Sequence, residues 1–366
     1  MKLVMIGHGM VGHKFIEAIL EKADDELEIT ILAEEPRIAY DRVHLTEYFS
    51  GKSAKDLSLA RFDFADAYGI DLRLNTKAVA IDTAAQTVTT NHGDVISYDK
   101  LVLATGSYAF VPPIPGNDRE NCFVYRTIED LDAIRAASLK AKTGVVIGGG
   151  LLGLEAAKAL RDLALETHVV EFAPRLMAVQ VDDLGGKVLR TKIENLGVKV
   201  HTQKATQSIE DGASAVHVMK FGDGSELETD IVLFSAGIRP RDELARSSGL
   251  AIGERGGIVI NDYCQTSHAD IYAIGECALW NNKIFGLVAP GYDMARIAAK
   301  HMMQQDTNLF AGADMSTKLK LMGVDVASVG DAHAMTPNSL SYFYADEAAQ
   351  IYKKIVVSAD KTKLLG

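Results

Sequence analysis

Cysteine, positive charge and long apolar runs are all scarce in this sequence. Its three cysteines, Cys122, Cys264 and Cys277, lack the spacing of a redox pair or of a metal site, so we expect buried thiols and no bound metal. A net charge of −11 at pH 7 argues against a nucleic-acid-binding surface. The apolar runs fall short of the roughly 20 residues that a membrane-spanning helix needs. These absences predict a cytoplasmic protein with no membrane or nucleic-acid partner.

Two glycine-rich segments stand out, and each follows a short apolar run. Residues 7–12 read GHGMVG after the run 3–6, and residues 148–153 read GGGLLG after the run 145–147. Each pattern is typical of the strand, tight turn and helix start of a dinucleotide-binding unit. A pyrophosphate approaches the backbone of such a turn, where a Cβ would block it, and the helix start offers free N–H groups. The pair predicts two nucleotides bound by one chain.

An acidic residue follows the second strand expected in each unit. Glu34 and Glu35 come after the apolar run 29–32, and Glu171 comes after Val169 and Val170. A carboxylate at this place accepts hydrogen bonds from ribose hydroxyls, contributing about 1.5–3 kcal/mol. The alternative for Glu34 is a solvated acid at a strand end, and Glu35 is a weaker candidate than Glu34.

The length and the order of apolar runs predict an α/β chain of two or three domains. The 366 residues exceed the roughly 250–300 at which one core usually divides. Strands are expected at 2–6, 28–33, 70–74, 77–82, 86–91, 100–104, 143–147, 166–171, 231–234 and 270–276, with alternating strands over 198–228. The strands at 70–74, 77–82 and 86–91 would form a small antiparallel crossover. Helices are expected at 10–23, 129–138, 152–163, 181–196 and 293–304, with a short helix within 40–49 and a proline-rich linker at 111–116.

The C-terminal part of the sequence has a different pattern. From Asp314 onward it favours strands, at 318–322, 325–329, 341–344 and 351–357. The sequence offers no long helix to cover these strands. We therefore expect a small β-rich C-terminal domain that is incomplete, in a chain cut from something longer.

Further segments make the chain resemble the flavoproteins that carry two dinucleotide-binding folds, which include glutathione-reductase-like enzymes, ferredoxin and rubredoxin reductases, and apoptosis-inducing-factor-like proteins. These segments are ATG at 104–106, AGIRP at 236–240, TS at 266–267 and DIYAIGE at 270–276. Within that group, essentially the whole chain resembles the N-terminal FAD- and NAD(P)H-binding module of assimilatory nitrite reductase large subunits. The segments that carry this closer resemblance are 34–45, 125–131, 148–157, 171–174 and 285–291.

The resemblance implies that the first fingerprint binds FAD and the second binds NAD(P)H, in two Rossmann-like domains arranged as in glutathione reductase. The FAD domain would comprise 1–112 and 242–312, with the NAD(P)H domain inserted at 113–241 and the C-terminal domain at 313–366. The implied FAD-binding residues are Gly7, Gly9, Met10, Gly12, Glu34, Glu35, Arg42, Val79, Ala104, Thr105, Gly106, Gly275 and Glu276. The implied NAD(P)H-binding residues are Gly148, Gly150, Leu151, Leu152, Gly153, Glu171, Ala236 and Gly237.

Three of these residues and one further glutamate receive specific roles. Arg42 would face the FAD phosphates, its alternative being an ordinary surface ion pair, and Glu276 would hold ribityl hydroxyls or a phosphate-bound water. Glu171 would repel an adenosine 2′-phosphate, and each charge pair at ~4 Å would cost about 1–4 kcal/mol. We therefore expect NADH to be preferred over NADPH. Arg175 could reach a phosphate, which would oppose this preference. Glu155 would orient the nicotinamide at its contact with the flavin, its alternative being a first-turn acid stabilised by the helix dipole.

The sequence departs from the ferredoxin reductases in ways that fit the nitrite reductase group. Val43 and His44 replace prolines, Glu47 replaces a lysine near the flavin, and the second flavin motif ends in Gly275-Glu276 rather than Gly-Asp. His8 lies inside the first glycine segment. We expect His8 to face solvent or to bond the backbone rather than to act as a base.

The segment 40–49 holds no cysteine, so we expect electrons to leave reduced flavin directly. In nitrite reductase large subunits the next centres are sirohaem and an iron–sulfur cluster, and three scattered cysteines cannot supply four cluster ligands. We therefore predict an FAD-dependent NADH oxidoreductase module, unable to reduce nitrite alone, whose redox partners are further domains or a subunit of nitrite reductase. The alternatives are a stand-alone NADH-dependent ferredoxin or rubredoxin reductase, and a redox-sensing interaction protein. A homodimer is left open.

Overall fold

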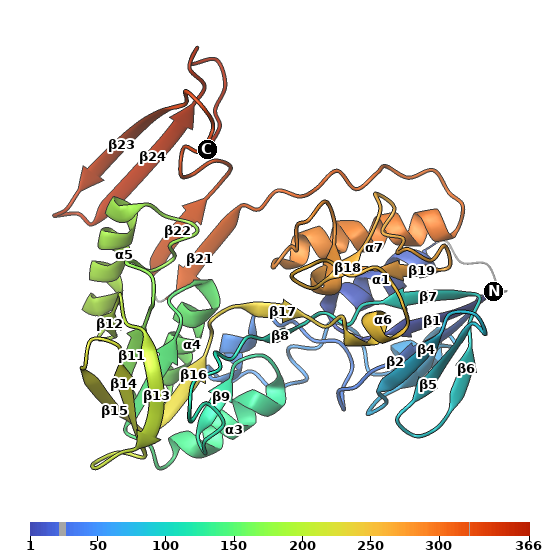
Figure 1. Ribbon diagram of the computed structural model, residues 1–366, viewed down its shortest axis with the longest axis horizontal. Helices are drawn as coiled ribbons and strands as arrows, with labels where there is room; N and C mark the ends of the chain where they lie inside the picture. Colours follow the sequence, from blue (N-terminus) through green and yellow to red (C-terminus); the bar gives the residue numbers. More distant parts are fainter. Residues whose placement is uncertain (22–26, 322) are drawn as a thin grey trace. The chain divides into compact units, whose positions relative to one another are not determined.

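The computed structural model describes residues 1–21, 27–321 and 323–366 (Figure 1). The end of the first expected helix, at 22–23, and the end of the strand expected at 318–322 lie outside the described residues. Internal contacts divide the chain into two compact units. The first unit comprises 1–43, 53–108 and 238–313, and the second comprises 44–52, 109–237 and 314–366.

The first unit is built on a parallel five-stranded sheet with the order β19-β7-β1-β2-β3. Its strands are β1 (Lys2–Ile6), β2 (Glu28–Leu32), β3 (Asp71–Arg73), β7 (Lys100–Leu103) and β19 (Ile271–Ala273). The sequence of β1 is apolar on both faces because both faces of a central parallel strand are covered. Helices α1 (Met10–Leu20) and α7 (Val288–Met302) pack against each other beside it (Figure 1).

The first unit also holds smaller elements. A three-stranded antiparallel sheet joins β4 (Ala78–Asp82), β5 (Thr87–Thr90) and β6 (Val95–Ser97). The remaining pieces are α2 (Phe64–Ala67), β8 (Ser107–Ala109), β17 (Ile238–Pro240), α6 (Glu243–Ser247), β18 (Ile258–Val259), η2 (Gly275–Cys277) and β20 (Ala278–Leu279), with β8 paired to β17 and β18 to β20.

The second unit repeats the plan of the first. Its parallel sheet has the order β12-β11-β10-β16-β9, and the strands are β9 (Cys122–Val124), β10 (Thr143–Ile147), β11 (Glu166–Val170), β12 (Lys199–His201) and β16 (Ile231–Phe234). Its helices are η1 (Leu45–Tyr48), α3 (Ile128–Ser138), α4 (Leu151–Asp162) and α5 (Asp183–Asn195). An antiparallel sheet joins β13 (Thr206–Asp211), β14 (His217–Phe221) and β15 (Glu226–Thr229).

The C-terminal residues form two antiparallel hairpins. The first pairs β21 (Thr317–Leu321) with β22 (Val324–Ser328), and the second pairs β23 (Leu340–Asp346) with β24 (Ile351–Val357). β24 contacts α5, where the Tyr352 hydroxyl and the Lys354 ammonium both donate to Asp182, at 2.6 and 3.1 Å. Contacts therefore group these hairpins with the second unit, while the predicted boundaries of three domains stay a prediction.

Three secondary-structure expectations need correction. The strand expected at 70–74 belongs to the parallel sheet, as β3 beside β2, and the third antiparallel strand is β6, which was not foreseen. α7 begins at Val288, five residues before the expected start at 293, because Pro290 falls in its first turn, where a missing N–H costs nothing. The strands β8, β9 and β17 were missed because each has three residues and exists through pairing with distant segments.

Candidate functional site

The first glycine loop, residues 7–12, joins β1 to α1. Gly7 has φ +100°, and a Cβ there would lie 2.3 Å from the carbonyl oxygen of Ala104. A Cβ on Gly12 would lie 2.6 Å from the carbonyl oxygen of Gly7. These two glycines are therefore required by the loop itself. A Cβ on Gly9 would meet no described heavy atom within 4 Å, so this glycine faces open space.

The second glycine loop, residues 148–153, joins β10 to α4 with the same geometry. Gly148 has φ +119°, and its Cβ would lie 2.2 Å from the carbonyl oxygen of Ser235. A Cβ on Gly153 would lie 2.0 Å from the carbonyl oxygen of Gly148, whereas Gly150 has no described neighbour within 4 Å of such a Cβ. The middle glycine of each loop leaves the space that a pyrophosphate would fill.

The helix starts at the two loops differ from those of α3 and α5. Thr127 caps α3 in a capping box with Asp130, and Asp182 accepts the Gly185 N–H, at 3.1 Å, to cap α5. By contrast, α1 and α4 begin after glycine caps, Gly9 and Gly150, and carry no acid in their first turn. The first N–H groups of these helices, those of Met10, Leu151 and Leu152 among them, are left for an anion.

The carboxylate of Glu171 lies across the second loop. One of its oxygens accepts the Gly149 N–H at 2.5 Å and the other accepts the Ala173 N–H at 2.6 Å. A Cβ on Gly149 would lie 3.0 Å from this carboxylate and 2.6 Å from Leu176 Cδ2. Gly149 is therefore a glycine because Glu171 and Leu176 occupy the side-chain space.

The acids of the first unit do not repeat this arrangement. The Gly7 N–H donates to the Leu32 carbonyl at 2.9 Å, and the Gly148 N–H donates to the Val170 carbonyl at 2.8 Å. Leu32 and Val170 are therefore equivalent strand ends in the two units. Glu171 directly follows its strand end, and the residue in the matching place is Ala33. Glu34 is one position further along, so the acids of the two units lie at different distances from their strand ends.

Glu34 is held by two cations of the first unit. Lys77 Nζ lies 3.2 Å from one of its oxygens and Arg241 Nη1 lies 2.7 Å from the other. Partial burial works against ionisation, but the charges of Arg241 and Lys77 outweigh it and lower the pKa of Glu34. No local pattern indicated Lys77 or Arg241 as neighbours of Glu34, because they come from segments far apart in the chain.

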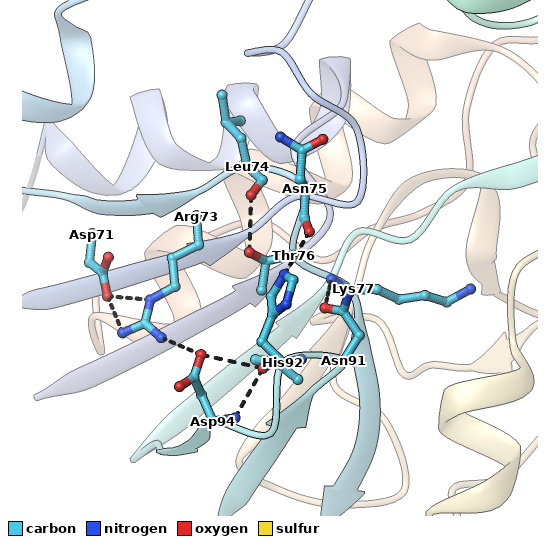
Figure 2. Close-up of polar contacts among 10 residues, drawn as sticks. Asp71, Arg73, Leu74, Asn75, Thr76, Lys77, Asn91, His92 and Asp94 are labelled. Carbon is cyan, nitrogen blue, oxygen red and sulfur yellow. Dashed lines mark hydrogen bonds and ion pairs between the residues drawn. The ribbon is translucent and has the colours of Figure 1, made fainter.

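A polar network joins the segment that runs from β3 to Lys77 with the turn between β5 and β6 (Figure 2). The Lys77 N–H donates to Asn91 Oδ1 at 2.8 Å, and His92 Nε2 lies 3.1 Å from the Asn75 carbonyl oxygen. Arg73 binds Asp71 and reaches Asp94 at 3.5 Å. The segment from β3 to Lys77 also pairs with the acidic segment, since the Asn75 N–H donates to the Glu35 carbonyl at 3.2 Å.

Glu35, Arg42 and Tyr40 form one cluster beside α1. The Tyr40 hydroxyl donates to Glu35 at 2.8 Å, and Arg42 forms an ion pair with the other oxygen of Glu35. The Arg42 N–H lies 3.4 Å from Met10 Sδ, and the guanidinium lies 4.7 Å from the centre of the Tyr40 ring. Arg42 is one-quarter exposed, so it is not a surface ion pair of the ordinary kind, and its charge lies near the start of α1.

Among the other residues proposed for FAD, Ala104 and Gly275 lie beside the first glycine loop, since a Cβ on Gly275 would lie 3.3 Å from Val11. Ala104 follows β7 and its carbonyl abuts Gly7, and the Ser107 hydroxyl donates to Glu276 at 2.6 Å. Val79 lies between Ala78 and Ala80, where the register of the β4–β5 pair shifts, so Val79 has no paired residue on β5. The remaining positions are Thr105, which donates to the Arg241 carbonyl at 2.7 Å, and Gly106 and Gly275, with φ of +68° and +78°.

Glu155 is the fifth residue of α4, which places it beyond the first turn. Burial raises the pKa of this carboxyl to about 7, while the nearby charge of His44 acts in the opposite direction. The first-turn interpretation of Glu155 is therefore wrong. A carboxyl with this pKa exists in both protonation states near neutral pH, so it can hold or release a proton.

The segment 44–52 packs on the helices of the second unit. The Tyr125 hydroxyl donates to Thr46 Oγ1 at 3.1 Å, and Arg135 Nη2 donates to the Tyr48 carbonyl at 2.6 Å. This is the segment in which no cysteine occurs. The Ala236 and Gly237 positions proposed for NAD(P)H are exposed and follow Ser235, the neighbour of Gly148.

The structure contradicts the expectation for His8. Its side chain is buried, at 8% exposure, and neither ring nitrogen has a hydrogen-bond partner among the described residues. The ring stacks on Phe64, with centroids 5.4 Å apart, and lies 5.6 Å from the ring of His13. Burial, assisted by His13, lowers the pKa of His8 to about 3. The apolar contact with Phe64 is long-range and left no signal in the local sequence.

Comparison with known proteins identifies the family. The family model described as pyridine nucleotide-disulphide oxidoreductase matches residues 1–328. The chain belongs to this family. The rubredoxin NAD+ reductase C-terminal domain matches residues 316–366. Membership makes the chain an oxidoreductase that uses FAD and NAD(P)H, and it confirms the predicted α/β fold with two Rossmann-like units.

Individual relatives agree with the family. The nitrite reductase (NADH) large subunit of Escherichia coli is 56% identical over all of this chain, which covers 43% of that protein. The rubredoxin-NAD(+) reductase of Alcanivorax borkumensis is 30% identical over 85% of this chain and 81% of its own length. The solved NAD-dependent persulfide reductase of A. fulgidus superposes with a TM-score of 0.90 at 26% identity, covering all of this chain and 73% of that one.

The chain therefore spans about two fifths of the length of the nitrite reductase relatives. Within the described residues, no cluster of three or more side chains could hold a metal ion, and no helix combines the length and hydropathy needed to cross a bilayer. Cys264 and Cys277 are buried free thiols, and Cys122 is a partly buried one.

Proposed function

We propose that this chain is the NADH-oxidising FAD module of a nitrite reductase large subunit. The observation that carries the proposal is the repeated loop geometry, in which Gly9 and Gly150 each leave room for one pyrophosphate at an uncapped helix start. The 56% identity to a nitrite reductase (NADH) large subunit over the whole chain supports the assignment to that enzyme. FAD, when bound, accepts a hydride and passes electrons on singly or in pairs.

The residues of the first unit bind FAD, and those of the second unit bind NADH. In the first unit, the 7–12 loop and Arg42 hold the FAD pyrophosphate, Glu34 faces the adenosine ribose, and Glu276 faces the ribityl chain. In the second unit, the 148–153 loop holds the NADH pyrophosphate and Glu171 accepts from the ribose hydroxyls. A carboxylate beside the ribose disfavours the 2′-phosphate of NADPH, so NADH is the preferred donor.

Glu155 acts as a positioning residue for the nicotinamide. With a pKa of about 7, Glu155 is partly ionised at neutral pH, and its carboxylate form would stabilise the positive charge that develops on the nicotinamide. The electrons then leave the flavin for centres on further domains or a subunit of nitrite reductase, sirohaem and an iron–sulfur cluster. A cytoplasmic location and a homodimer stay predictions.

The deciding experiment is an anaerobic titration of the flavin-loaded chain with NADH, followed by absorption. We expect the oxidised flavin bands to bleach at about one equivalent of NADH, and no nitrite to be consumed. Gly150→Ala is the matched control, since it changes the NADH loop in open space and leaves the FAD loop untouched. A chain that retains no flavin, or whose flavin NADH does not bleach, contradicts the proposal.

A second candidate is a stand-alone NADH-dependent rubredoxin or ferredoxin reductase. The match of residues 316–366 to the rubredoxin reductase C-terminal domain favours it, as does the relative of which this chain covers 81%. Turnover of NADH with added rubredoxin or ferredoxin separates the two. Sustained oxidation of NADH with either carrier at low concentration favours the stand-alone reductase. Bleaching of the flavin by one equivalent of NADH, without further oxidation of NADH, favours the nitrite reductase module.

A further inference from the structure

Arg175 is the one cation in the sequence between Glu171 and the start of α5. Its backbone is anchored on both sides next to the second glycine loop. The Ala173 N–H donates to the Glu171 carboxylate at 2.6 Å, and the Met177 N–H donates to the Gly149 carbonyl at 2.8 Å. Arg175 therefore starts from the edge of the proposed nucleotide site.

The side chain of Arg175 nevertheless runs along the first turn of α5. Its Nε donates to the Val181 carbonyl at 2.9 Å, and its Nη1 donates to Asp183 Oδ1 at 2.6 Å. Its aliphatic part crosses Gly186, where a Cβ would lie 2.8 Å from Arg175 Cβ and 2.9 Å from its Cδ. Two hydrogen bonds thus hold the guanidinium at the start of α5, and the absence of a side chain at Gly186 leaves room for the aliphatic part of Arg175.

We propose that Arg175 is a latent ligand for an adenosine 2′-phosphate, and that its attachment to Asp183 and Gly186 determines the preference for NADH together with Glu171. An arginine near the end of the second strand is the group that accommodates this phosphate in NADP-binding units, because its planar fork matches phosphate oxygens. The inference rests on the proposed function, which places the adenosine ribose beside Glu171.

Asp183 is the part of this attachment that is easiest to break. Its side chain is 88% exposed, and an ion pair open to water contributes little stability. Removing it leaves Arg175 with its bond to Val181 and its contact on Gly186. The attachment therefore selects the nucleotide without being needed for the fold of α5.

The test uses two release variants, each of which loosens the attachment of Arg175 by removing a different part of it. Asp183→Ala removes the carboxylate, and Gly186→Ala displaces the aliphatic part without changing the charge. Calorimetric titration with adenosine 2′,5′-bisphosphate measures the result, with 5′-AMP as the control ligand. We expect both variants to bind the bisphosphate about tenfold more tightly than the unaltered chain, the equivalent of one charge-assisted hydrogen bond, and to bind 5′-AMP unchanged.

Arg175→Ala in each release variant shows whether the arginine is responsible. The gain must disappear in both double variants, while Arg175→Ala alone leaves bisphosphate binding as it was. A gain that survives Arg175→Ala is an effect of removing the Asp183 charge and overturns the proposal, as does unchanged bisphosphate binding in both release variants.

Flavin reduction by NADH in the same set keeps this inference apart from the proposed function. If the unaltered chain is not reduced by NADH, the proposed function fails, while bisphosphate binding still reports on Arg175. If NADH reduces the flavin in every variant and bisphosphate binding does not respond, the Arg175 proposal fails alone.

Discussion

The two glycine loops share a backbone and differ in what surrounds it. A Cβ on the first or the last glycine of each loop would lie less than 3 Å from a carbonyl oxygen, so these glycines are required. A Cβ on the middle glycine of each loop would meet no described atom within 4 Å. The second position differs, since it is His8 in the first loop and Gly149 in the other. The residue after the strand end differs with it, being Ala33 in the first unit and Glu171 in the second.

These paired differences have a physical reason. Gly149 leaves room for Glu171 to lie across its loop and to accept two backbone N–H groups. A side chain at this position would exclude the carboxylate, and His8 stands there in the first loop. Three glycines therefore fix the backbone shared by the two loops, while the variable second position decides whether a carboxylate can lie across the loop.

The acids also differ in how their charge is balanced. Glu34 is paired with Lys77 and Arg241, so its charge is neutralised within the first unit. Glu171 is held by two backbone N–H donors, and no cation forms an ion pair with it among the described residues. A compensated acid suits a cofactor that stays bound, and an uncompensated acid suits discrimination between nucleotides that exchange.

The largest effect is expected from alanine at the first glycine of either loop. Gly7→Ala and Gly148→Ala each place a Cβ within 2.3 Å of a carbonyl oxygen at a positive φ, and we expect each to lower the free energy of unfolding by more than about 3 kcal/mol. Denaturant unfolding measures it. Gly51→Ala, at φ +103° with open space around it, is the matched control and should lose only about 1 kcal/mol. Equal losses at all three positions would show that strain, rather than contact, requires these glycines.

Alanine at the middle glycines should separate the cofactors. Gly9→Ala is expected to lose FAD, and Gly150→Ala to raise the Kd for NADH roughly 100-fold, the loss of two bonds to a charged phosphate. Stability should stay within about 0.5 kcal/mol, because neither Cβ meets another atom. Flavin content and NADH titration measure the two effects. Loss of both cofactors in one variant would contradict independent loops.

Neutralising the acid of each unit tests the difference in charge. Glu171→Gln is expected to raise the ratio of kcat/KM for NADPH to that for NADH about tenfold, since repulsion of the 2′-phosphate disappears. Glu34→Gln is the control from the other unit and should leave this ratio unchanged. Steady-state kinetics with both nucleotides decide it, and an equal change in both variants would show that the ratio does not depend on Glu171.

The sequence predicted the parts of this arrangement that depend on local pattern. The central strands β1, β10 and β16 and the helices α1 and α4 lie within a few residues of their expected positions, because apolar runs and glycines specify them locally. The two loops were identified for the same reason.

Features set by long-range contacts could not be predicted. The offset between Glu34 and Glu171 depends on which strand residue each loop bonds, and the burial of His8 depends on Phe64. The pairing of Glu34 with Arg241 joins segments far apart in the chain. No local pattern encodes these contacts.

The fifth residue of the helix after each loop offers a smaller contrast. It is Lys14 in α1, paired with Glu17 at 2.8 Å, and Glu155 in α4, whose pKa burial raises to about 7. Flavin reduction by NADH should therefore quicken several-fold as pH rises through about 7 and Glu155 ionises. Glu155→Gln should flatten the profile, and it should also stabilise the chain at pH 8, where ionised Glu155 costs folding free energy. Lys14→Gln is the control, and a profile unchanged in Glu155→Gln would assign the dependence to another group.

The smallest effect is expected at His8, the residue that distinguishes the first loop from the second. The pKa of His8 in the folded chain, about 3, lies below the ordinary value of 6.5. Below pH 6.5 His8 is therefore protonated in the unfolded chain and neutral in the folded chain. Stability should therefore fall as pH falls, by under about 1 kcal/mol between pH 7.5 and 6. His8→Phe keeps a ring against Phe64 and should lessen this slope, which thermal unfolding across that range measures. The remaining slope comes from the other histidines whose pKa burial lowers, at positions 13, 168, 201, 217 and 301. His13 faces the same cluster and is also buried, with its pKa lowered by burial, so His13→Phe is the companion variant. A slope that is unchanged in His8→Phe and smaller in His13→Phe would assign the effect to His13 in α1 rather than to His8 in the loop.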